Sequence, residues 1–241
     1  MPSYPPKPDV LDRMEILAAG WERSADRKAV FLRCYSMMTG NTLLAIGKME
    51  FRDNAWVRRL LDRFAEYYFE ALETYERDPV QAPAVWRITH DVAHQQDLWT
   101  LQHLLLGVNA HINYDLVLTV AELLQDEWQN LGDAKRAQRQ EDFNYVNAII
   151  ARTIDAVQDD ILAPDMPALG VVDTLLGRLD EFVISRIIAS WRDAVWKQAV
   201  VLVELESENA RIEHVNAIEA AVINKADALI DRRWRSFLKP E

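Results

Sequence analysis

Four strongly polar side chains lie within an otherwise apolar stretch at residues 105–118. They are Asn109, His111, Asn113 and Asp115. A buried amide or imidazole without a hydrogen-bond partner costs on the order of 1–3 kcal/mol, and an unpaired buried carboxylate costs more. These groups must therefore be satisfied by one another, by other helices or by a ligand.

On a helix, the spacing of these residues separates them into two pairs. His111 and Asp115 are four residues apart and share one face, whereas Asn109 and Asn113 share a different face. A His-x-x-x-Asp pair can act in acid–base chemistry, with the carboxylate orienting the imidazole and raising its pKa, or it can give two ligands to a metal ion. It can also tie neighbouring helices together without any chemistry. We favour a functional role for the pair.

Arg192 is a second polar residue within an apolar segment, and it shares a helical face with Ile188 and Trp196. A guanidinium group in such surroundings needs a partner. A carboxylate such as Asp115 or Asp142 can neutralise it, and a structural salt bridge of this kind is the commoner outcome. Alternatively, Arg192 faces a cavity and binds an anionic or carbonyl-bearing ligand.

Residues 107–116, with the core Asn-Ala-His-Ile-Asn-x-Asp-Leu, resemble the hallmark of a family of bacterial and fungal proteins classed only as a domain of unknown function. An aromatic block at 56–71 and segments 142–147 and 192–196 are also similar to that family, so the resemblance covers about residues 25–205. The family brings no established activity. The resemblance implies one site that contains Asn109, His111, Asn113, Asp115, Asp142, Asn147 and Arg192.

The composition indicates that helices position these side chains. The chain has 241 residues and only 7 glycines, far below the usual share of about 7%, while half of its residues are apolar. Few glycines argue against all-β proteins, which need frequent tight turns, and against nucleotide-binding α/β folds, whose phosphate loops need glycine. We therefore expect an all-α fold and no nucleotide cofactor.

Helical spacing of apolar residues predicts a single-domain bundle of about seven or eight helices. Residues 1–8 should form an extended, proline-rich lead-in and residues 9–241 one all-α domain, because no linker has the character of a domain boundary. Two nearly all-apolar segments, 101–128 and 183–203, should be central helices. Local signals predict a helix end at Gly20, a kink at Gly40, a cap at Asp53 or Asn54, an interruption at Gly107 and a charged linker at 132–141.

The charge balance narrows the possible partners. The chain has 27 basic and 38 acidic residues, a net charge of −11, which opposes binding to nucleic-acid backbones and anionic lipid surfaces. No apolar run approaches the ~20 residues of a membrane span, and the first residues lack the apolar stretch of a signal peptide. We expect a cytoplasmic protein with a small-molecule ligand and with neither nucleic acid nor membrane as partner, while homo-oligomerisation stays open.

Two further metal-binding patterns are incomplete. His90-Asp91-x-x-His94 is similar to the His-Glu-x-x-His arrangement of zinc proteases, but aspartate shortens the general base by one methylene and no further ligand motif follows. A di-iron bundle needs two Asp/Glu-x-x-His motifs, and Asp91-x-x-His94 is the single one in the chain. His90 and His94 are better explained as ordinary helix residues at a surface or pocket rim.

The preferred hypothesis is a helical enzyme that acts on a small organic molecule between two helices. His111 serves as general acid–base, Asp115 orients it and Arg192 anchors an anion. The other candidate substrate contacts are Asn109, Asn113, Asp142, Asn147 and Trp196. One alternative is a hydrolase in which His111 and Asp115 bind a divalent metal, and another is a non-catalytic helical binding or scaffold protein. The sequence does not define the substrate or the reaction.

Overall fold

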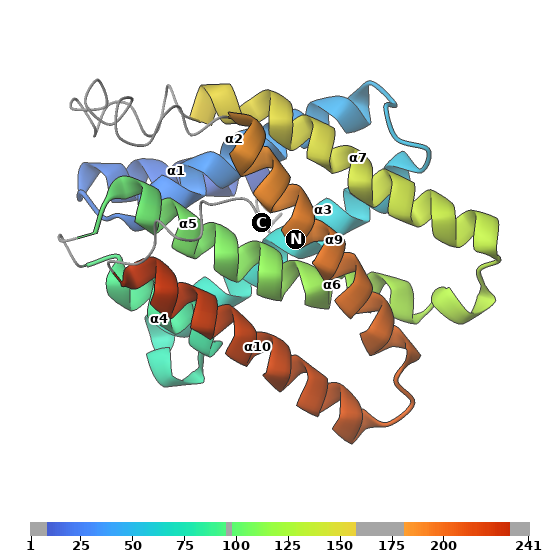
Figure 1. Ribbon diagram of the computed structural model, residues 1–241. Coiled ribbons are helices and arrows are strands. Elements are labelled where there is room, and N and C mark those ends of the chain that lie inside the picture. The colour runs from blue at the N-terminus through green and yellow to red at the C-terminus, as the bar shows by residue number, and fades with distance from the viewer. Residues whose placement is uncertain (1–8, 95–97, 158–180, 232–241) are drawn as a thin grey trace, which may run out of the picture.

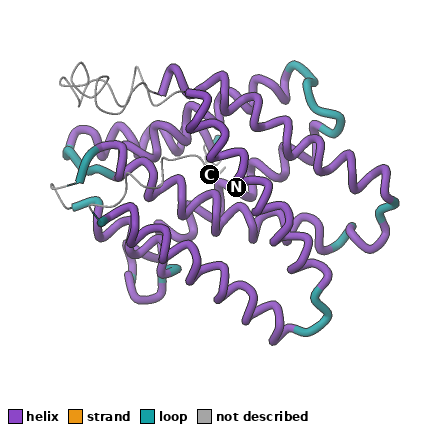
Figure 2. The backbone as a smooth tube through the Cα atoms, viewed as in Figure 1, coloured by secondary structure: helices purple, strands orange, loops and turns teal. Residues whose placement is uncertain are grey.

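The computed structural model describes residues 9–94, 98–157 and 181–231, so the predicted lead-in at 1–8 lies outside the described residues. Within these ranges the regular structure consists of helices joined by short loops, with no strand (Figure 2). The helices pack together as one bundle (Figure 1). The predicted all-α fold and helical-bundle architecture are confirmed.

The first three helices are α1 (Val10–Arg23), α2 (Lys28–Gly47) and α3 (Asn54–Arg77). The predicted end at Gly20 is wrong, because α1 continues through it, and α2 likewise continues through Gly40 without a break. Helix packing outweighs the low helix propensity of glycine, and a side-chain atom at Gly40 would lie 3.8 Å from Leu11 of the neighbouring helix. The cap of α3 is Asp53, whose carboxylate accepts a hydrogen bond from the N–H of Trp56 at 2.9 Å.

A continuous helical rod runs through the middle of the bundle from Thr100 to Gln125. It consists of α5 (Thr100–Ala110), a π-helical turn η2 (His111–Asp115) and α6 (Leu116–Gln125). The rod packs against α2 and α3, and also against α4 (Ala84–Val92), α9 (Glu181–Glu204) and α10 (Glu208–Ile230). The prediction that no apolar run approaches the length of a membrane span is wrong, because the rod is long and apolar enough to cross a membrane. However, 78% of its most apolar window is buried in the protein, as in a core helix.

The C-terminal part contains α7 (Asp133–Val157), α9 (Glu181–Glu204) and α10 (Glu208–Ile230). Two short 3-10 turns, η1 (Pro79–Gln81) and η3 (Trp128–Asn130), lie earlier in the chain. The predicted charged linker at 132–141 is wrong, since α7 begins at Asp133.

Helix α9 is not buried on every side. It packs against α6 and α7, but Asp193, Lys197 and Val201 on its outer side are exposed, Val201 by 41%. The rod is thus central as predicted, whereas α9 packs against the rod and α7 on one side and leaves its other side exposed.

Gly107 lies where the rod meets α2. The sequence suggests that this glycine bends the helix or admits another backbone, but α5 continues through it and the neighbour is the side chain of Phe31. A Cβ atom at position 107 would overlap the Phe31 ring and lie 2.6 Å from the Phe31 Cβ. The glycine therefore lets α2 approach the rod four residues before His111.

Candidate functional site

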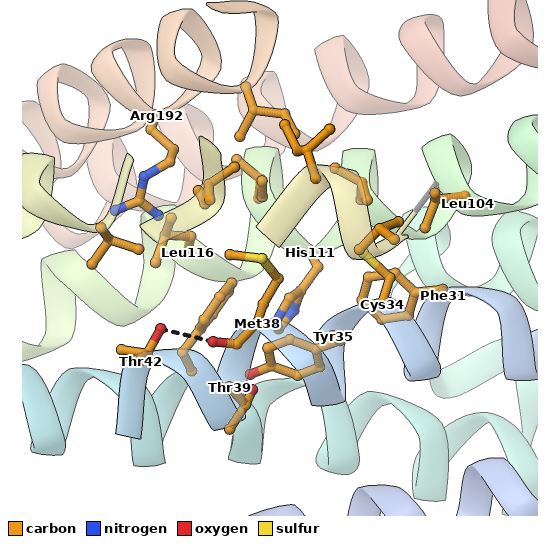
Figure 3. Close-up of a pocket in the computed structure, with 18 of the residues that line it drawn as sticks. Phe31, Cys34, Tyr35, Met38, Thr39, Thr42, Leu104, His111, Leu116 and Arg192 are labelled. Carbon is orange, nitrogen blue, oxygen red and sulfur yellow. Dashed lines mark hydrogen bonds between the residues drawn. The ribbon is translucent and has the colours of Figure 1, made fainter. Parts of the chain in front are cut away.

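A cavity of about 160 Å³ lies among α2, α3, α7, α9 and the central rod. Its wall is almost entirely apolar, including Met38 from α2, Leu60 from α3, Leu104 from α5 and Ile150 from α7. Two groups able to carry a positive charge, His111 and Arg192, also line it. In Figure 3, Arg192 lies at one end of the drawn side chains, Leu104 at the other and His111 between them.

Asp115 holds the imidazole of His111 through a hydrogen bond at Nδ1. The Nδ1 atom of His111 lies 2.8 Å from Oδ2 of Asp115, and both side chains are almost fully buried. The Nε1–H of Trp86 donates to both oxygens of the same carboxylate, at 3.0 Å each. Asp115 itself does not line the cavity. The carboxylate is therefore placed to orient the imidazole rather than to touch a bound molecule.

The π-helical turn places this pair in the middle of the rod. The N–H of Leu116 bonds to the carbonyl of His111, five residues earlier, instead of the usual four. The hydroxyl of Thr119 donates to the carbonyl of Asp115 at 2.7 Å. Single π turns inside α-helices occur frequently at functional sites. The π-helical turn begins at His111 and ends at Asp115, so it contains both members of the pair.

Aromatic rings fix the imidazole plane. The ring of Phe64 stacks on His111 with centroids 3.6 Å apart and planes within 9°, and Tyr35 meets it edge-on at 4.3 Å. The Nε2 atom of His111 is buried and has no hydrogen-bond partner among the described residues. Leaving such an atom unpaired costs about 1–3 kcal/mol. His111 therefore has one ring nitrogen fixed by the protein and one that lacks a partner.

Burial determines the protonation of the pair. The apolar surroundings lower the pKa of His111 well below its usual range and raise the pKa of Asp115 well above its usual range, although the Trp86 hydrogen bond opposes the second effect. The imidazole is therefore uncharged near neutral pH. When Nδ1 carries the proton and donates it to Asp115, Nε2 offers a lone pair, as a general base requires.

Arg192 brings a buried guanidinium to the cavity. Its Nε donates to the side-chain oxygen of Asn147 and its Nη2 to the carbonyl of Phe143, both at 2.7 Å. Both acceptors are neutral, and among the described residues no carboxylate forms an ion pair with Arg192. Burial lowers the pKa of Arg192 to about 9. The predicted alternative of a salt bridge to Asp115 or Asp142 is wrong, because both carboxylates bond elsewhere.

Asn109 and Asn113 form a separate polar pair away from the cavity. The amide of Asn113 donates to Asn109 Oδ1, and the amide of Asn109 donates to the carbonyl of Val222 in α10, both at 3.0 Å. Neither residue lines the cavity. Their predicted role as substrate contacts is not supported by this placement, because the face they share points to α10.

Asp142 and Trp196 also lie away from the cavity lining. The carboxylate of Asp142 accepts hydrogen bonds from the backbone N–H groups of Arg52 and Asp53, at 2.8 and 2.9 Å, and so secures the start of α3. Trp196 packs on Phe143, with ring centroids 5.2 Å apart. Both predicted substrate contacts are instead packing or capping residues. Asn147 is not in the lining either, but it holds Arg192.

The donor atoms do not fit a metal ion. One nitrogen of His111 and both oxygens of Asp115 are engaged with each other or with Trp86. In the described ranges no group of three or more His, Cys, Asp or Glu side chains is placed to hold a metal. Structural and catalytic zinc sites need three or four such ligands. The described part of the chain thus gives no support to the alternative of a metal-dependent hydrolase.

Nearly the whole chain matches one protein family. The model of a family of unknown function, DUF5995, matches residues 8–232. The chain belongs to this family. No curated protein and no solved structure matches this chain. The match confirms the predicted membership of a family of unknown function and extends beyond residues 25–205. Membership of DUF5995 does not assign an activity, so the function must be inferred from the chemistry of the site.

Sequence reasoning missed three features of this DUF5995 site. The sequence does not identify Trp86 as the partner of Asp115, and it does not show that α2 and α7 each contribute a wall to a cavity. On α2, Phe31, Cys34 and Met38 follow one another at helical spacing, so they were recognisable as one face but not as a cavity wall. The thiol of Cys34 stays protonated, since burial raises its pKa to about 12.

Proposed function

We propose that this protein is a small-molecule enzyme in which the His111–Asp115 pair carries out acid–base chemistry in the apolar cavity. The observation that carries the proposal is the arrangement of the imidazole: Asp115 engages Nδ1, while Nε2 of a cavity-lining side chain has no described partner. An unpartnered nitrogen alone does not mark a site, since both ring nitrogens of the buried His90 also lack described partners; His111 differs because it lines the main cavity and a carboxyl group holds its other nitrogen.

The chemistry follows from the two ends of the imidazole. Nε2 takes a proton from the bound molecule, and the positive charge that develops on the ring is stabilised by the carboxylate at 2.8 Å. The N–H of Trp86 keeps that carboxylate in position. Arg192, at the same cavity, stabilises negative charge on the substrate. The apolar wall lowers the polarity around these groups and so strengthens their electrostatic interactions.

The test compares the wild-type protein with His111→Gln on a library of small apolar carbonyl compounds, esters and acids. The compounds are incubated in D₂O, and mass spectrometry records both consumption and deuterium incorporation. We expect at least one compound to react with the wild type and its rate to fall by about 100-fold or more in His111→Gln, as for the loss of a general base.

His214→Gln is the matched control, because His214 lies outside the cavity lining and bonds to the side chain of Gln198 on α9. It should retain the wild-type rate. Asp115→Asn is a second variant of the pair. It keeps a polar side chain of the same size, so it should reduce the rate without leaving a cavity at position 115. Compounds that bind without any being consumed, or equal rates in wild type and His111→Gln, would show a binding protein rather than this enzyme.

A further inference from the structure

The charge of the cavity lining restricts the molecule that fits it. Arg192 is the one lysine or arginine side chain in the described lining, and no aspartate or glutamate is part of that lining. An isolated buried charge is costly, and the two neutral acceptors of Arg192 do not cancel it. A bound molecule with one negative charge would make this end of the cavity neutral.

The two hydrogen bonds of Arg192 leave some of its guanidinium N–H groups available to a ligand. Its Nε and Nη2 are each engaged once, while its Nη1 donates in neither bond. Asn147 and Phe143 hold the group from the side of α7, so its orientation does not depend on a ligand. A planar guanidinium matches the two oxygens of a carboxylate, with parallel N–H···O bonds.

The rest of the lining selects an apolar body. Apart from Arg192 and His111, the wall is formed mainly by aliphatic and aromatic side chains such as Met38, Phe64 and Ile188. A cavity of about 160 Å³ is close in size to the ~150 Å³ cavity known to bind benzene, so about six to eight carbon atoms fit. Burying such a body is favourable by ~0.8 kcal/mol per CH₂ group.

We propose that the cavity binds the monoanion of a small carboxylic acid, with its apolar body against the aliphatic wall and its carboxylate at Arg192. The inference rests on the cavity of the proposed function and names the class of molecule that enters it. A dianionic phosphate would leave excess negative charge in a buried site, and an amine would add a second positive charge. In the proposed orientation the body of the acid passes His111, which lies between the two ends (Figure 3).

The test is calorimetric titration of the full chain with octanoate, 1-octanol and octylamine, three probes with the same chain length. We expect octanoate to bind the wild type at least tenfold more tightly than 1-octanol, and octylamine to bind more weakly than either. This comparison needs no variant and therefore does not depend on whether a substitution folds.

The variants then locate the preference. In Arg192→Met, octanoate should lose about tenfold or more in affinity and fall to the level of 1-octanol, whose own affinity stays within about threefold. Lys197→Met is the matched control, because Lys197 is an exposed cation of the same helix, paired with Asp193. It should leave both affinities unchanged.

Equal affinity of the wild type for octanoate and 1-octanol would overturn the inference, and so would a preference for octanoate that persists in Arg192→Met. These outcomes are separate from a failure of the proposed function. If octanoate is preferred through Arg192 but no compound is consumed in a His111-dependent manner, the function fails and the ligand class stands. If neutral compounds are consumed in a His111-dependent manner and octanoate binds no more tightly than 1-octanol, the proposed function stands and the ligand class fails.

Discussion

At the scale of single residues, the orientation of His111 depends on a chain of two hydrogen bonds. Trp86 donates to Asp115, and Asp115 engages Nδ1 of the imidazole. Because the His111 imidazole is uncharged near neutral pH, the buried Asp115 carboxyl group has no cationic partner among the described residues, and the indole N–H carries much of its stabilisation. Four-residue spacing was sufficient to predict the His111–Asp115 contact. It could not predict Trp86, which comes from a different helix.

Replacing Trp86 by Phe should destabilise the protein more than the same replacement at Trp56. Both indoles are fully buried, but Nε1 of Trp86 serves Asp115, whereas Nε1 of Trp56 has no partner among the described residues. Each substitution removes a similar volume from the core. Loss of a hydrogen bond to a buried charged group adds about 2 kcal/mol, so Trp86→Phe should lose that much more unfolding free energy than Trp56→Phe.

Urea unfolding at pH 7 measures this difference directly. The Trp56→Phe variant serves as the control for lost packing, and it also removes an unsatisfied donor. Equal losses of stability in the two variants would mean that the Trp86 hydrogen bond contributes nothing to holding Asp115.

At the scale of elements, the meeting of α2 with the central rod sets the position of the site. Phe31 of α2 packs on Gly107 and also contacts the His111 ring, with centroids 5.6 Å apart. Tyr35, one turn later on α2, lies 4.3 Å from the same ring. The spacing of the two helices therefore determines how closely the aromatic side chains enclose the imidazole.

The substitution Gly107→Ala tests this close approach. Helix propensity alone would make alanine more stable than glycine by about 1 kcal/mol. The new Cβ would overlap the Phe31 ring, so we expect a net loss of about 2 kcal/mol or more in unfolding free energy. Gly20→Ala is the matched control, because Gly20 lies within α1 with nothing within 4 Å of its added Cβ, and it should gain stability. Thermal unfolding that shows a gain in both variants would refute the close approach.

The elements also show what the sequence can and cannot predict. Local patterns were enough for the all-α class, the Asp53 cap and the central rod, since each depends on spacing within one segment. Which faces meet is a property of packing. The separate face of Asn109 and Asn113 was predicted correctly, but its contact with α10 places these residues away from the cavity.

Polar residues in apolar segments show the same limit. Arg192 was correctly expected to be a buried group in need of partners, yet the sequence offered carboxylates, and the structure supplies Asn147 and a backbone carbonyl. Asp142 was expected at the site because of the family resemblance. Its carboxylate instead binds backbone N–H groups at the start of α3, a contact between segments 90 residues apart.

At the scale of the whole molecule, two buried histidines make the fold sensitive to acid. His90 is 2% exposed, packs on Trp86 with ring centroids 5.2 Å apart, and burial lowers its pKa to about 3. Its burial excludes the expected surface position, while the alternative of a position at a pocket agrees with the small cavity that His90 lines. The pKa of His111 is lowered in the same direction. Both imidazoles regain their ordinary pKa of about 6.5 in the unfolded chain.

Stability should therefore fall as the pH drops below about 6.5. Between this value and about 3, the unfolded chain binds a proton at position 90 that the folded protein does not bind, so unfolding free energy decreases with decreasing pH. Once the unfolded imidazole is protonated, each such histidine contributes a slope of up to about 1.4 kcal/mol per pH unit. The raised pKa of Asp115 acts in the opposite direction and offsets part of the effect of His111, so the fold is expected to be weaker at pH 5 than at pH 7 chiefly because of His90.

His90→Phe isolates one part of this effect, because phenylalanine keeps an aromatic ring on Trp86 and cannot be protonated. Urea unfolding at pH 7, 6 and 5 should show a shallower loss of stability with acid than in the wild type, with the remaining slope due in part to His111. His214→Phe is the matched control on the partly exposed α10 and should keep the wild-type slope. An acid slope in His90→Phe as steep as in the wild type would show that His90 is already protonated or solvated in the folded protein, contrary to its buried, unpartnered position.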